Sequence, residues 1–524
     1  MTATHDECKP TEDSAIDEHT PPRPRRAVLL WAGGAALLCA LTAFLVMPTA
    51  PEMHHESGDP ELATTVAELL PQDAAVGVSA AVIDGNEVTQ ATLGTTDGAA
   101  PVRTDTAFET GSVQKTLTAT LLADMVRTGE VHLDTTLAEI WTDLDFTADN
   151  VAEITLEQLA THHAGLPPMH NDAGNLAAVS LHNLLGTDPY RWLADPVEAV
   201  AARSDGAPED EAEYTYSNLG YATLGQSLAQ VAGEDYPTVL TDRVLEPLGM
   251  NDTTLLDTPE VPANGAAPHR NPTLGVQPSF NPANAPAGLG TWTTTEDMVT
   301  LVQTAMAEED PALAAAQEPR VRGTPDSPYE EHIGLAWIQW TIDDTEVTWH
   351  NGGTAGSRSF VAHTGDDRAV VVLANSARVP VETIGLQLLD PDMPEFEGSS
   401  TIPLPATVLA HVLAVAAPFA VLLRMARRRV TSWTPPLDQV GAVSTLLLGS
   451  ASWALSLRVG DPDLIPAFWA LGAGALGAAA VLGVWRWPKL PHARGARPWH
   501  RWVDLGVNMA IVAATAAGIL LATR

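Results

Sequence analysis

A serine and a lysine three positions apart are the first residues in this sequence whose spacing indicates chemistry. The segment Ser112–Lys115 lies at the start of a stretch with helical periodicity, so both side chains fall on one helix face about one turn apart. A lysine in a partly desolvated pocket has a lowered pKa and can take the proton of a serine hydroxyl, which makes the serine a nucleophile. The helix N-terminus favours developing negative charge. Taken alone, the motif also fits an ordinary helix surface.

The elements around this motif predict strands at both ends of one domain, with helices between them. Apolar runs at 76–82 and 88–93 flank turn residues and predict a hairpin. Helix formers extend from Thr116 to Thr128, and Gly129 is the expected C-terminal cap. The later strand-like runs are Ile333–Thr341, Glu346–Trp349, Ser359–His363 and Ala369–Ala374. We therefore predict an α+β fold whose first and last strands join one antiparallel sheet.

Further motifs follow the Ser-Lys pair in a fixed order. After Phe108–Thr116 come Leu133-Asp134, Ile154–Leu156, Leu159–Pro167, Tyr216-Ser217-Asn218, Glu246–Met250 and His350–Gly353. This series resembles the serine β-lactamase and penicillin-binding-protein superfamily, particularly the class C β-lactamase and esterase branch. The resemblance covers about residues 62–378 and implies a β-lactamase-like antiparallel sheet flanked by helices, with an all-helical region.

The resemblance implies a role for each site residue. Ser112 would be the nucleophile and Lys115 its base, while Tyr216 would carry a proton to the leaving group. For that, nearby cationic Lys115 would need to lower the phenol pKa from about 10. Asn218 would point its amide at the substrate, and the backbone N–H groups of Ser112 and Gly353 would form an oxyanion hole. A core tyrosine and a turn-stabilising asparagine are the alternatives.

His350-Asn351-Gly352 stands where many relatives have Lys-Thr-Gly on a strand lining the site. Gly352 and Gly353 would allow a substrate to approach the strand backbone closely. A lysine here can hold a substrate carboxylate, whereas a histidine is mostly neutral at pH 7. We therefore expect His350 to favour esters, or amides without a nearby carboxylate. Arg358 could restore a positive charge, but we expect it to form a surface ion pair.

The expected reaction is acyl transfer from an ester or amide, with a small molecule or a cell-envelope component as substrate. D-alanyl peptides, small esters and β-lactams all fit the resemblance, and no cofactor is required. His162 and His163 are expected to pack beneath the site, and no metal site is expected because further ligands are missing. The alternative is a catalytically weak, hydrolase-like sensor or binding protein that acts through its transmembrane helices. Intact Ser112, Lys115 and Tyr216 favour the enzyme.

The composition excludes one class of partner. The chain has 65 acidic and 27 basic residues, a net charge of −38, so binding of nucleic acid through a basic face is not expected. Of the two cysteines, Cys8 lies in the N-terminal tail and Cys39 in an apolar run. The predicted hydrolase domain therefore has no disulfide.

Five apolar runs are long enough to span a bilayer, namely Ala27–Met47, Ile402–Leu423, Val440–Leu457, Ile465–Trp485 and Val503–Leu521. Arginines precede the first run, follow the second and separate the fourth from the fifth, which orients the N-terminus towards the cytoplasm. The predicted organisation is a cytoplasmic tail (1–26), a transmembrane anchor (27–49), a linker (50–61), an extracytoplasmic hydrolase domain (62–395) and four transmembrane helices (402–524). The plasma membrane is the expected location.

Overall fold

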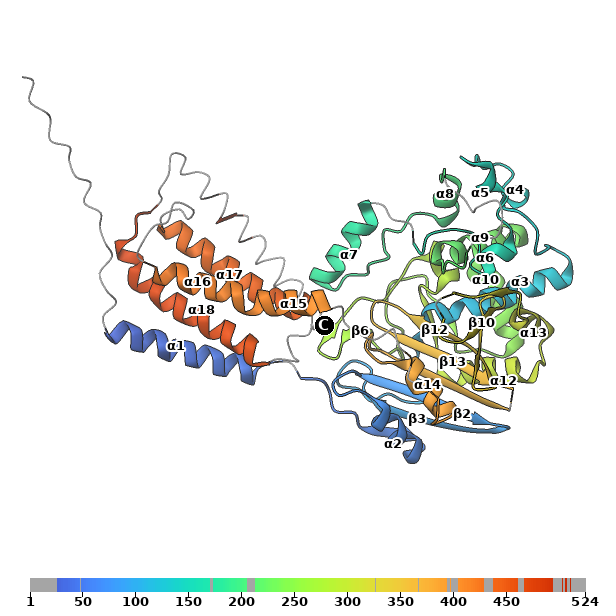
Figure 1. Ribbon diagram of the computed structural model, residues 1–524, viewed down its shortest axis with the longest axis horizontal. Helices are drawn as coiled ribbons and strands as arrows, with labels where there is room; N and C mark the ends of the chain where they lie inside the picture. Colours follow the sequence, from blue (N-terminus) through green and yellow to red (C-terminus); the bar gives the residue numbers. More distant parts are fainter. Residues whose placement is uncertain are drawn as a thin grey trace, which may run out of the picture. The chain divides into compact units, whose positions relative to one another are not determined.

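The computed structural model describes residues 26–492 and the single residues 502, 505, 506 and 509. Within that range, the description leaves out residues 48, 170–172, 205–212, 326, 366, 394–395, 397–403, 428–436 and 460–465. The chain forms two compact units: one contains Pro48–Leu404, and the other is built from Met1–Met47 and Pro405–Ala513. Figure 1 colours both units by sequence, and each is considered by itself.

A nine-stranded antiparallel sheet, in the order β1-β3-β2-β14-β13-β12-β11-β10-β9, is the centre of the larger unit. Its strands are β1 (His55–Gly58), β2 (Gly77–Asp84), β3 (Glu87–Gly94), β9 (Val321–Arg322), β10 (Glu330–Ile333), β11 (Ile338–Ile342), β12 (Thr345–Gly353), β13 (Arg358–Thr364) and β14 (Arg368–Ala374). Two small sheets contain β4 (Phe108–Glu109), β8 (Thr291–Thr293) and β5 (Thr254–Leu255), and β6 (His269–Asn271) and β7 (Leu274–Gly275).

The predicted α+β sheet is confirmed in its main features. The hairpin is β2–β3, and the last strand, β14, pairs with β2 along its whole length, from Arg368 opposite Asp84 to Ala374 opposite Val78. The prediction of one strand over Ile333–Thr341 is wrong. A turn at residues 334–337 separates β10 from β11, and Ala336 adopts a left-handed φ of 67° there.

The prediction of a linker over residues 50–61 is corrected in part. Residues His55–Gly58 form β1 at the edge of the sheet, paired with β3, although their composition is polar. Helix α2 then begins at Pro60, capped by the Asp59 side chain. Pairing with the exposed edge of β3 uses backbone groups and requires no apolar side chains, so the residue types did not indicate this strand.

Helices cover both faces of the sheet. They are α2 (Pro60–Leu69), η1 (Gly111–Val113), α3 (Gln114–Thr128), α4 (Leu137–Ile140), α5 (Asp149–Ala152), α6 (Leu156–Ala160), α7 (Ala173–Leu185), α8 (Pro196–Ala201), α9 (Asn218–Ala232), α10 (Tyr236–Leu240), η2 (Thr241–Leu245), α11 (Glu246–Leu248), η3 (Pro282–Ala287), α12 (Thr295–Ala307), α13 (Pro311–Gln317) and α14 (Val381–Leu389). The predicted cap Gly129 ends α3 with a φ of 77°.

Successive side chains along the central strands point to opposite faces of the sheet, and each face has its own hydrophobic core. Val371 and Leu373 of β14 join the core that contains α3, α9 and α12, whereas Val370 and Val372 join the core that contains α2 and α14. Figure 1 shows α4, α5, α6, α8 and α9 gathered together on one side of this unit. The first core therefore carries the all-helical region, and it fixes α3 against the sheet.

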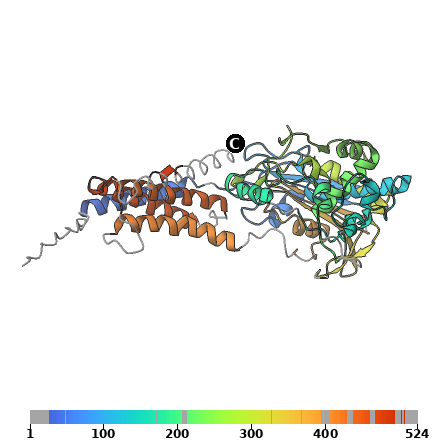
Figure 2. The same cartoon turned by 90° about the horizontal axis from the view of Figure 1, so that it is seen from above.

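The second unit is helical, with α1 (Arg26–Leu45), α15 (Leu404–His411), η4 (Val412–Ala416), α16 (Ala417–Ala426), α17 (Gln439–Val459), α18 (Pro466–Arg486) and η6 (Trp487–Lys489). Both views show α1, α16 and α18 packed lengthwise (Figures 1 and 2). Small residues allow this packing, because a Cβ on Gly477 would lie 2.6 Å from Cys39 Sγ.

Four helices within the described residues are long and apolar enough to cross a membrane, judged by length and composition. They are Arg26–Leu45, Val408–Ala426, Gln439–Leu457 and Pro466–Lys489. These helices coincide with the first four predicted spans. The fifth predicted span, Val503–Leu521, lies outside the described residues except for three isolated positions.

Candidate active site

Ser112 lies in the short 3₁₀ turn η1, directly before α3. Gly111 begins this turn with a φ of 51°, a conformation that favours glycine. Lys115 follows in the first turn of α3, and its Nζ lies 2.9 Å from Ser112 Oγ. The structure thus brings together the two residues that the spacing placed on one face.

Lys115 is the most deeply buried charged residue of the site, with none of its surface exposed. Besides Ser112, its Nζ contacts Asn218 Oδ1 and the backbone oxygen of Ala287, each at 2.7 Å. Burial lowers the pKa of the Lys115 ammonium well below its usual value, because the charged form is poorly solvated. Burial therefore favours the neutral amine over the ammonium form of this side chain.

Tyr216 immediately precedes α9, whose N-cap is Ser217. Its hydroxyl hydrogen-bonds Ser112, and the Lys115 Nζ lies 5.1 Å from the centre of its ring. The prediction that Lys115 lowers the Tyr216 pKa is wrong: burial raises the pKa of the phenol above its usual value of about 10. The reason is that the phenol is itself fully buried, and burial disfavours the charged phenolate.

His162 supports Tyr216 from behind. Its ring centre lies 4.3 Å from that of Tyr216, and its Nδ1 accepts a hydrogen bond from the Ser217 backbone N–H at 3.1 Å. The backbone of His162 has a left-handed φ of 62°. Among the described residues, no group of three His, Cys, Asp or Glu side chains has the arrangement of a metal site.

Strand β12 carries His350, Gly352 and Gly353 past the serine. A Cβ on Gly352 would lie 2.2 Å from the backbone oxygen of Thr110 and 3.0 Å from the Ser112 nitrogen, so only glycine fits there. Gly353 lines the pocket. These glycines therefore lie where they were expected, with the strand backbone directly beside Ser112.

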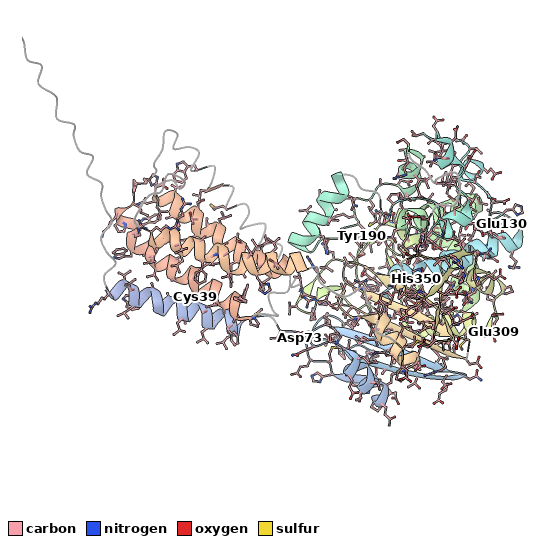
Figure 3. All side chains as sticks on the ribbon, viewed as in Figure 1. Cys39, Asp73, Glu130, Tyr190, Glu309 and His350 are labelled. Atoms are coloured by element: carbon pink, nitrogen blue, oxygen red, sulfur yellow. The ribbon has the colours of Figure 1, made fainter. Side chains whose placement is uncertain are left out.

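His350 lies fully buried on the same strand (Figure 3). Its Nδ1 donates to the backbone oxygen of Asn351 at 2.6 Å, which leaves Nε2 as an acceptor. Burial, and to a smaller extent Lys115, lowers the pKa of His350 to about 3. The imidazole is therefore neutral at pH 7. Arg358 does not line the pocket, and its Nε donates to the backbone oxygen of Ala377.

The segment that follows η3 belongs to the site and was missed at the sequence level. A Cβ on Gly288 would lie 2.1 Å from the Gly111 oxygen and 3.0 Å from the Ser112 nitrogen. Ala287, one residue earlier, supplies the carbonyl that Lys115 contacts. The available signal was the Gly-Leu-Gly sequence, since both Gly288 and Gly290 adopt a positive φ.

Glu109 is a second residue that the sequence did not single out. Its carboxylate is buried and accepts hydrogen bonds from the Ser279 backbone N–H at 2.7 Å, from Thr354 Oγ1 at 2.6 Å and from Ser357 Oγ at 3.0 Å. Burial raises the pKa of Glu109 to about 7. The carboxylate thus ties the strand before Ser112 to the loop after Gly353.

Ser112 lines a pocket of about 520 Å³, a volume that includes space open to solvent. Its lining residues are Gly111, Ser112, Met169, Tyr190, Leu193, Ala194, Asn218, Leu219, Asn284, Ala287, Gly288, Leu289 and Gly353. Tyr190 is one of these lining residues, and burial raises its pKa to about 12. Among the described residues, no Lys, Arg or His side chain lines this space.

Comparison with known proteins places this geometry in a family. Residues 62–387, more than half of the chain, match the family described as Beta-lactamase. The chain belongs to the Beta-lactamase family. Penicillin-binding protein 4 of Amycolatopsis lactamdurans is 33% identical over 30% of this chain and 38% of that protein. D-alanyl-D-alanine-carboxypeptidase/endopeptidase AmpH of Escherichia coli K12 is 28% identical over 49% of this chain and 67% of that protein.

Two solved structures show the same fold. The octameric penicillin-binding protein homologue from Pyrococcus abyssi is 21% identical, with a TM-score of 0.54 over 63% of this chain and 76% of that chain. A mutant of a class C β-lactamase is 20% identical, with a TM-score of 0.51 over 64% of this chain and 100% of that chain. These relatives are β-lactamases and penicillin-binding proteins, which are hydrolases, so the family is one of serine hydrolases.

Proposed function

We propose that this protein is a membrane-bound serine hydrolase that cleaves an ester or amide through an acyl-enzyme on Ser112. The observation that carries the proposal is the set of three atoms around Lys115 Nζ. A neutral amine has two N–H groups and one lone pair. The oxygens of Asn218 and Ala287 can only accept hydrogen bonds, so they take both N–H groups. The lone pair is left for the Ser112 hydroxyl, which is the orientation of a base.

The reaction then follows from the positions of three side chains. Ser112 Oγ bonds to the substrate carbonyl carbon as its proton passes to Lys115. Tyr216, whose raised pKa keeps the phenol protonated at pH 7, gives its proton to the leaving group as the old bond breaks, and Lys115 reprotonates Tyr216. Water attacks the acyl-enzyme, returns a proton to Ser112 Oγ and releases the acid.

The developing oxyanion is proposed to lie between the backbone N–H groups of Ser112 and Gly353. A Cβ on Gly111 would lie 2.6 Å from the Gly353 nitrogen, so the turn η1 and strand β12 meet closely at this point. Two such donors stabilise the charge that forms on the carbonyl oxygen in the transition state. Both residues line the pocket.

The proposed substrate has no carboxylate at the position that a lysine on β12 would serve. His350 is neutral there, and no cationic side chain lines the pocket within the described residues. Small-molecule esters and cell-envelope amides fit this description. D-alanyl peptides, suggested by the D-alanyl-D-alanine-carboxypeptidase among the relatives, and β-lactams both carry a carboxylate and fit this description less well.

We further propose a plasma-membrane location with the hydrolase domain, residues 62–395, outside. Four apolar helices of spanning length support it, together with a fifth apolar run at 503–521. Arginines at 23–26 and 424–429 would be retained on the cytoplasmic side. The N-terminal tail would then be cytoplasmic.

A labelling experiment tests the proposed function. The full chain in detergent micelles is treated with a fluorophosphonate and, separately, with a fluorescent penicillin, beside Ser112→Ala. Fluorophosphonate label on Ser112, found by mass spectrometry, is expected. Additional penicillin label would direct the search towards D-alanyl peptides. Absence of label from folded protein with both reagents would refute the hydrolase and favour a sensor.

A further inference from the structure

The two N–H groups of the proposed oxyanion hole come from segments that lie far apart in the sequence. Ser112 belongs to η1, whereas Gly353 ends β12. Two such donors stabilise an oxyanion only when both point at the same oxygen, and a displacement of about 1 Å can cost about 10²-fold in rate. The distance between these segments therefore matters for the proposed reaction, and some contact has to fix it.

The Glu109 carboxylate joins the two segments. It lies in β4, three residues before the nucleophile, and only 2% of its surface is exposed. Its Oε1 accepts from the Ser279 backbone N–H at 2.7 Å, and its Oε2 accepts from Thr354 Oγ1 at 2.6 Å and from Ser357 Oγ at 3.0 Å. Thr354 directly follows Gly353. One side chain thus connects the strand before one N–H donor with the residue after the other.

The end of β12 is the place where such a contact has an effect. Gly353 is the last residue of β12 that pairs with β13, where it lies opposite Arg358, and a turn over residues 354–357 follows. Strand pairing holds Gly353 from the side of β13. The bond from Thr354 to Glu109 ties it to the segment that carries η1.

The hydrogen bonds of Thr354 show why a carboxylate is needed here. Thr354 Oγ1 accepts from the backbone N–H groups of Gly356 at 3.3 Å and Ser357 at 3.0 Å, so its own proton is directed to Glu109. The Ser279 N–H at the other oxygen can only donate. Both oxygens of Glu109 must therefore be acceptors. An amide of the same shape has one acceptor oxygen and one NH₂, so a glutamine cannot serve both partners.

We propose that Glu109 is a positioning residue that sets the place of the Gly353 N–H relative to the Ser112 N–H, acting through Thr354. Glu109 is not among the residues that line the pocket, whereas Ser112 and Gly353 are. The inference rests on the proposed acyl transfer at Ser112. It adds that this buried carboxylate serves the transition state, beyond its contribution to stability.

Two esters that differ in one atom test the proposal. One is p-nitrophenyl acetate, and the other is its thiono analogue, in which sulfur replaces the carbonyl oxygen. Sulfur is a weak hydrogen-bond acceptor, so the thiono ester gains little from the two N–H donors. The ratio of the two kcat/KM values is measured for the full chain in detergent micelles. This ratio does not depend on the fraction of folded enzyme, so a loss of stability alone leaves it unchanged.

The variants are chosen to separate the contact from general packing. Glu109→Gln keeps the size of the side chain and removes one acceptor. Asp297→Asn is the matched control, because the Asp297 carboxylate is also buried and accepts from the Asp252 backbone N–H at 2.9 Å and from Thr253 Oγ1 at 2.6 Å, but it does not line the pocket. Thr354→Val and Thr354→Ser form a second pair, since valine removes the hydroxyl and serine keeps it.

The wild type is expected to prefer the ester at least about tenfold, the value of one hydrogen bond to a charged oxygen. Glu109→Gln and Thr354→Val should bring the ratio close to one, while Asp297→Asn and Thr354→Ser preserve it. An unchanged ratio in Glu109→Gln would overturn the inference alone, because an active wild type keeps the proposed function. A wild type that hydrolyses neither ester and takes no fluorophosphonate label on Ser112 would overturn both.

Discussion

Two clusters of buried polar side chains adjoin Ser112, and their hydrogen bonding differs. In the Glu109 cluster (Glu109, Ser279, Thr354 and Ser357), three donors reach one carboxylate. In the Lys115 cluster (Lys115, Tyr216, His162 and His350), the Nε2 atoms of both histidines are buried and have no hydrogen-bond partner among the described residues.

The Glu109 cluster has a structural role, whereas the Lys115 cluster contains the residues that are proposed to transfer protons. The Glu109 carboxylate holds two loops and the strand before Ser112 in register, because every group that it gathers is a donor. The Lys115 cluster is instead a region of low polarity, where burial lowers the pKa of Lys115 and of His350 and raises that of Tyr216. These shifts favour the uncharged form of each side chain, which suits a base and an acid that must exchange protons.

The largest effect is expected from removing the base. Lys115→Met should lower kcat/KM by at least about 10³-fold, because a general base contributes 10²–10⁴-fold and the amine beside the Ser112 hydroxyl is lost. Lys489→Met, a lysine outside the pocket, is the matched control. Steady-state ester hydrolysis measures both. Activity retained in Lys115→Met would assign the base elsewhere and remove the contrast between the clusters.

The pH profile gives a second test of the Lys115 cluster. Activity should rise with pH as Lys115 loses its proton, and the inflection should fall below the lysine reference of about 10.4, because burial lowers this pKa. The measurement is kcat/KM from pH 5 to 10 in the full chain. A profile that is still rising without an inflection at pH 10 would contradict the lowered pKa of Lys115.

Tyr216→Phe should lower kcat by about 10²-fold for alkyl esters, since the leaving alkoxide needs a proton. A p-nitrophenyl ester, whose leaving group departs without one, should lose much less. The comparison of the two esters on the same variant separates proton transfer from a loss of packing. Equal losses would assign Tyr216 a structural role beside His162.

The Glu109 cluster should respond in stability. Glu109→Leu leaves three donors without an acceptor, at about 1–3 kcal/mol for each buried group, so the thermal midpoint should fall; Glu309→Leu, on the surface, is the control. Since folding raises the Glu109 pKa to about 7, stability from its protonation is present below about 4.5 and is lost as pH rises to 7. The wild-type midpoint should therefore fall relative to Glu109→Gln across this window. Parallel curves would contradict the raised pKa.

The smallest effect is expected at His350. Its pKa of about 3 keeps it neutral throughout the working range, so His350→Gln should leave the position of the acid limb unchanged between pH 5 and 8. A shift of the limb in this variant would mean that His350 carries charge and that the Lys115 cluster is not uniformly neutral.

Local spacing made the contact between Ser112 and Lys115 predictable. Ser112 and Lys115 are separated by one helical turn, so the side chains meet wherever that helix forms. The hairpin and the cap at Gly129 were predictable for the same reason, since each depends on neighbours in the sequence. The membrane-spanning lengths likewise follow from composition alone.

Residues with distant partners could not be recognised in this way. Glu109 meets Thr354 across 245 positions, and Asn281 meets Tyr190 across 91, so neither carboxylate nor amide had a visible purpose in the sequence. The edge strand at His55–Gly58 pairs with β3 through backbone groups, which every residue has. A periodic pattern of apolar residues indicates which side chains are buried, and these interactions do not affect that pattern.

The sequence by itself indicated the candidate residues. The spacing of Ser112 and Lys115 fits a nucleophile and its base, and the resemblance to a known family implied a proton donor in Tyr216. Only the tertiary structure decided their protonation. The sequence suggested a cationic Lys115 that lowers the Tyr216 pKa, whereas burial of the phenol raises that pKa and burial of the amine lowers the Lys115 pKa. The physical reason is that a pKa depends on solvation, and solvation is fixed by residues brought from far along the chain.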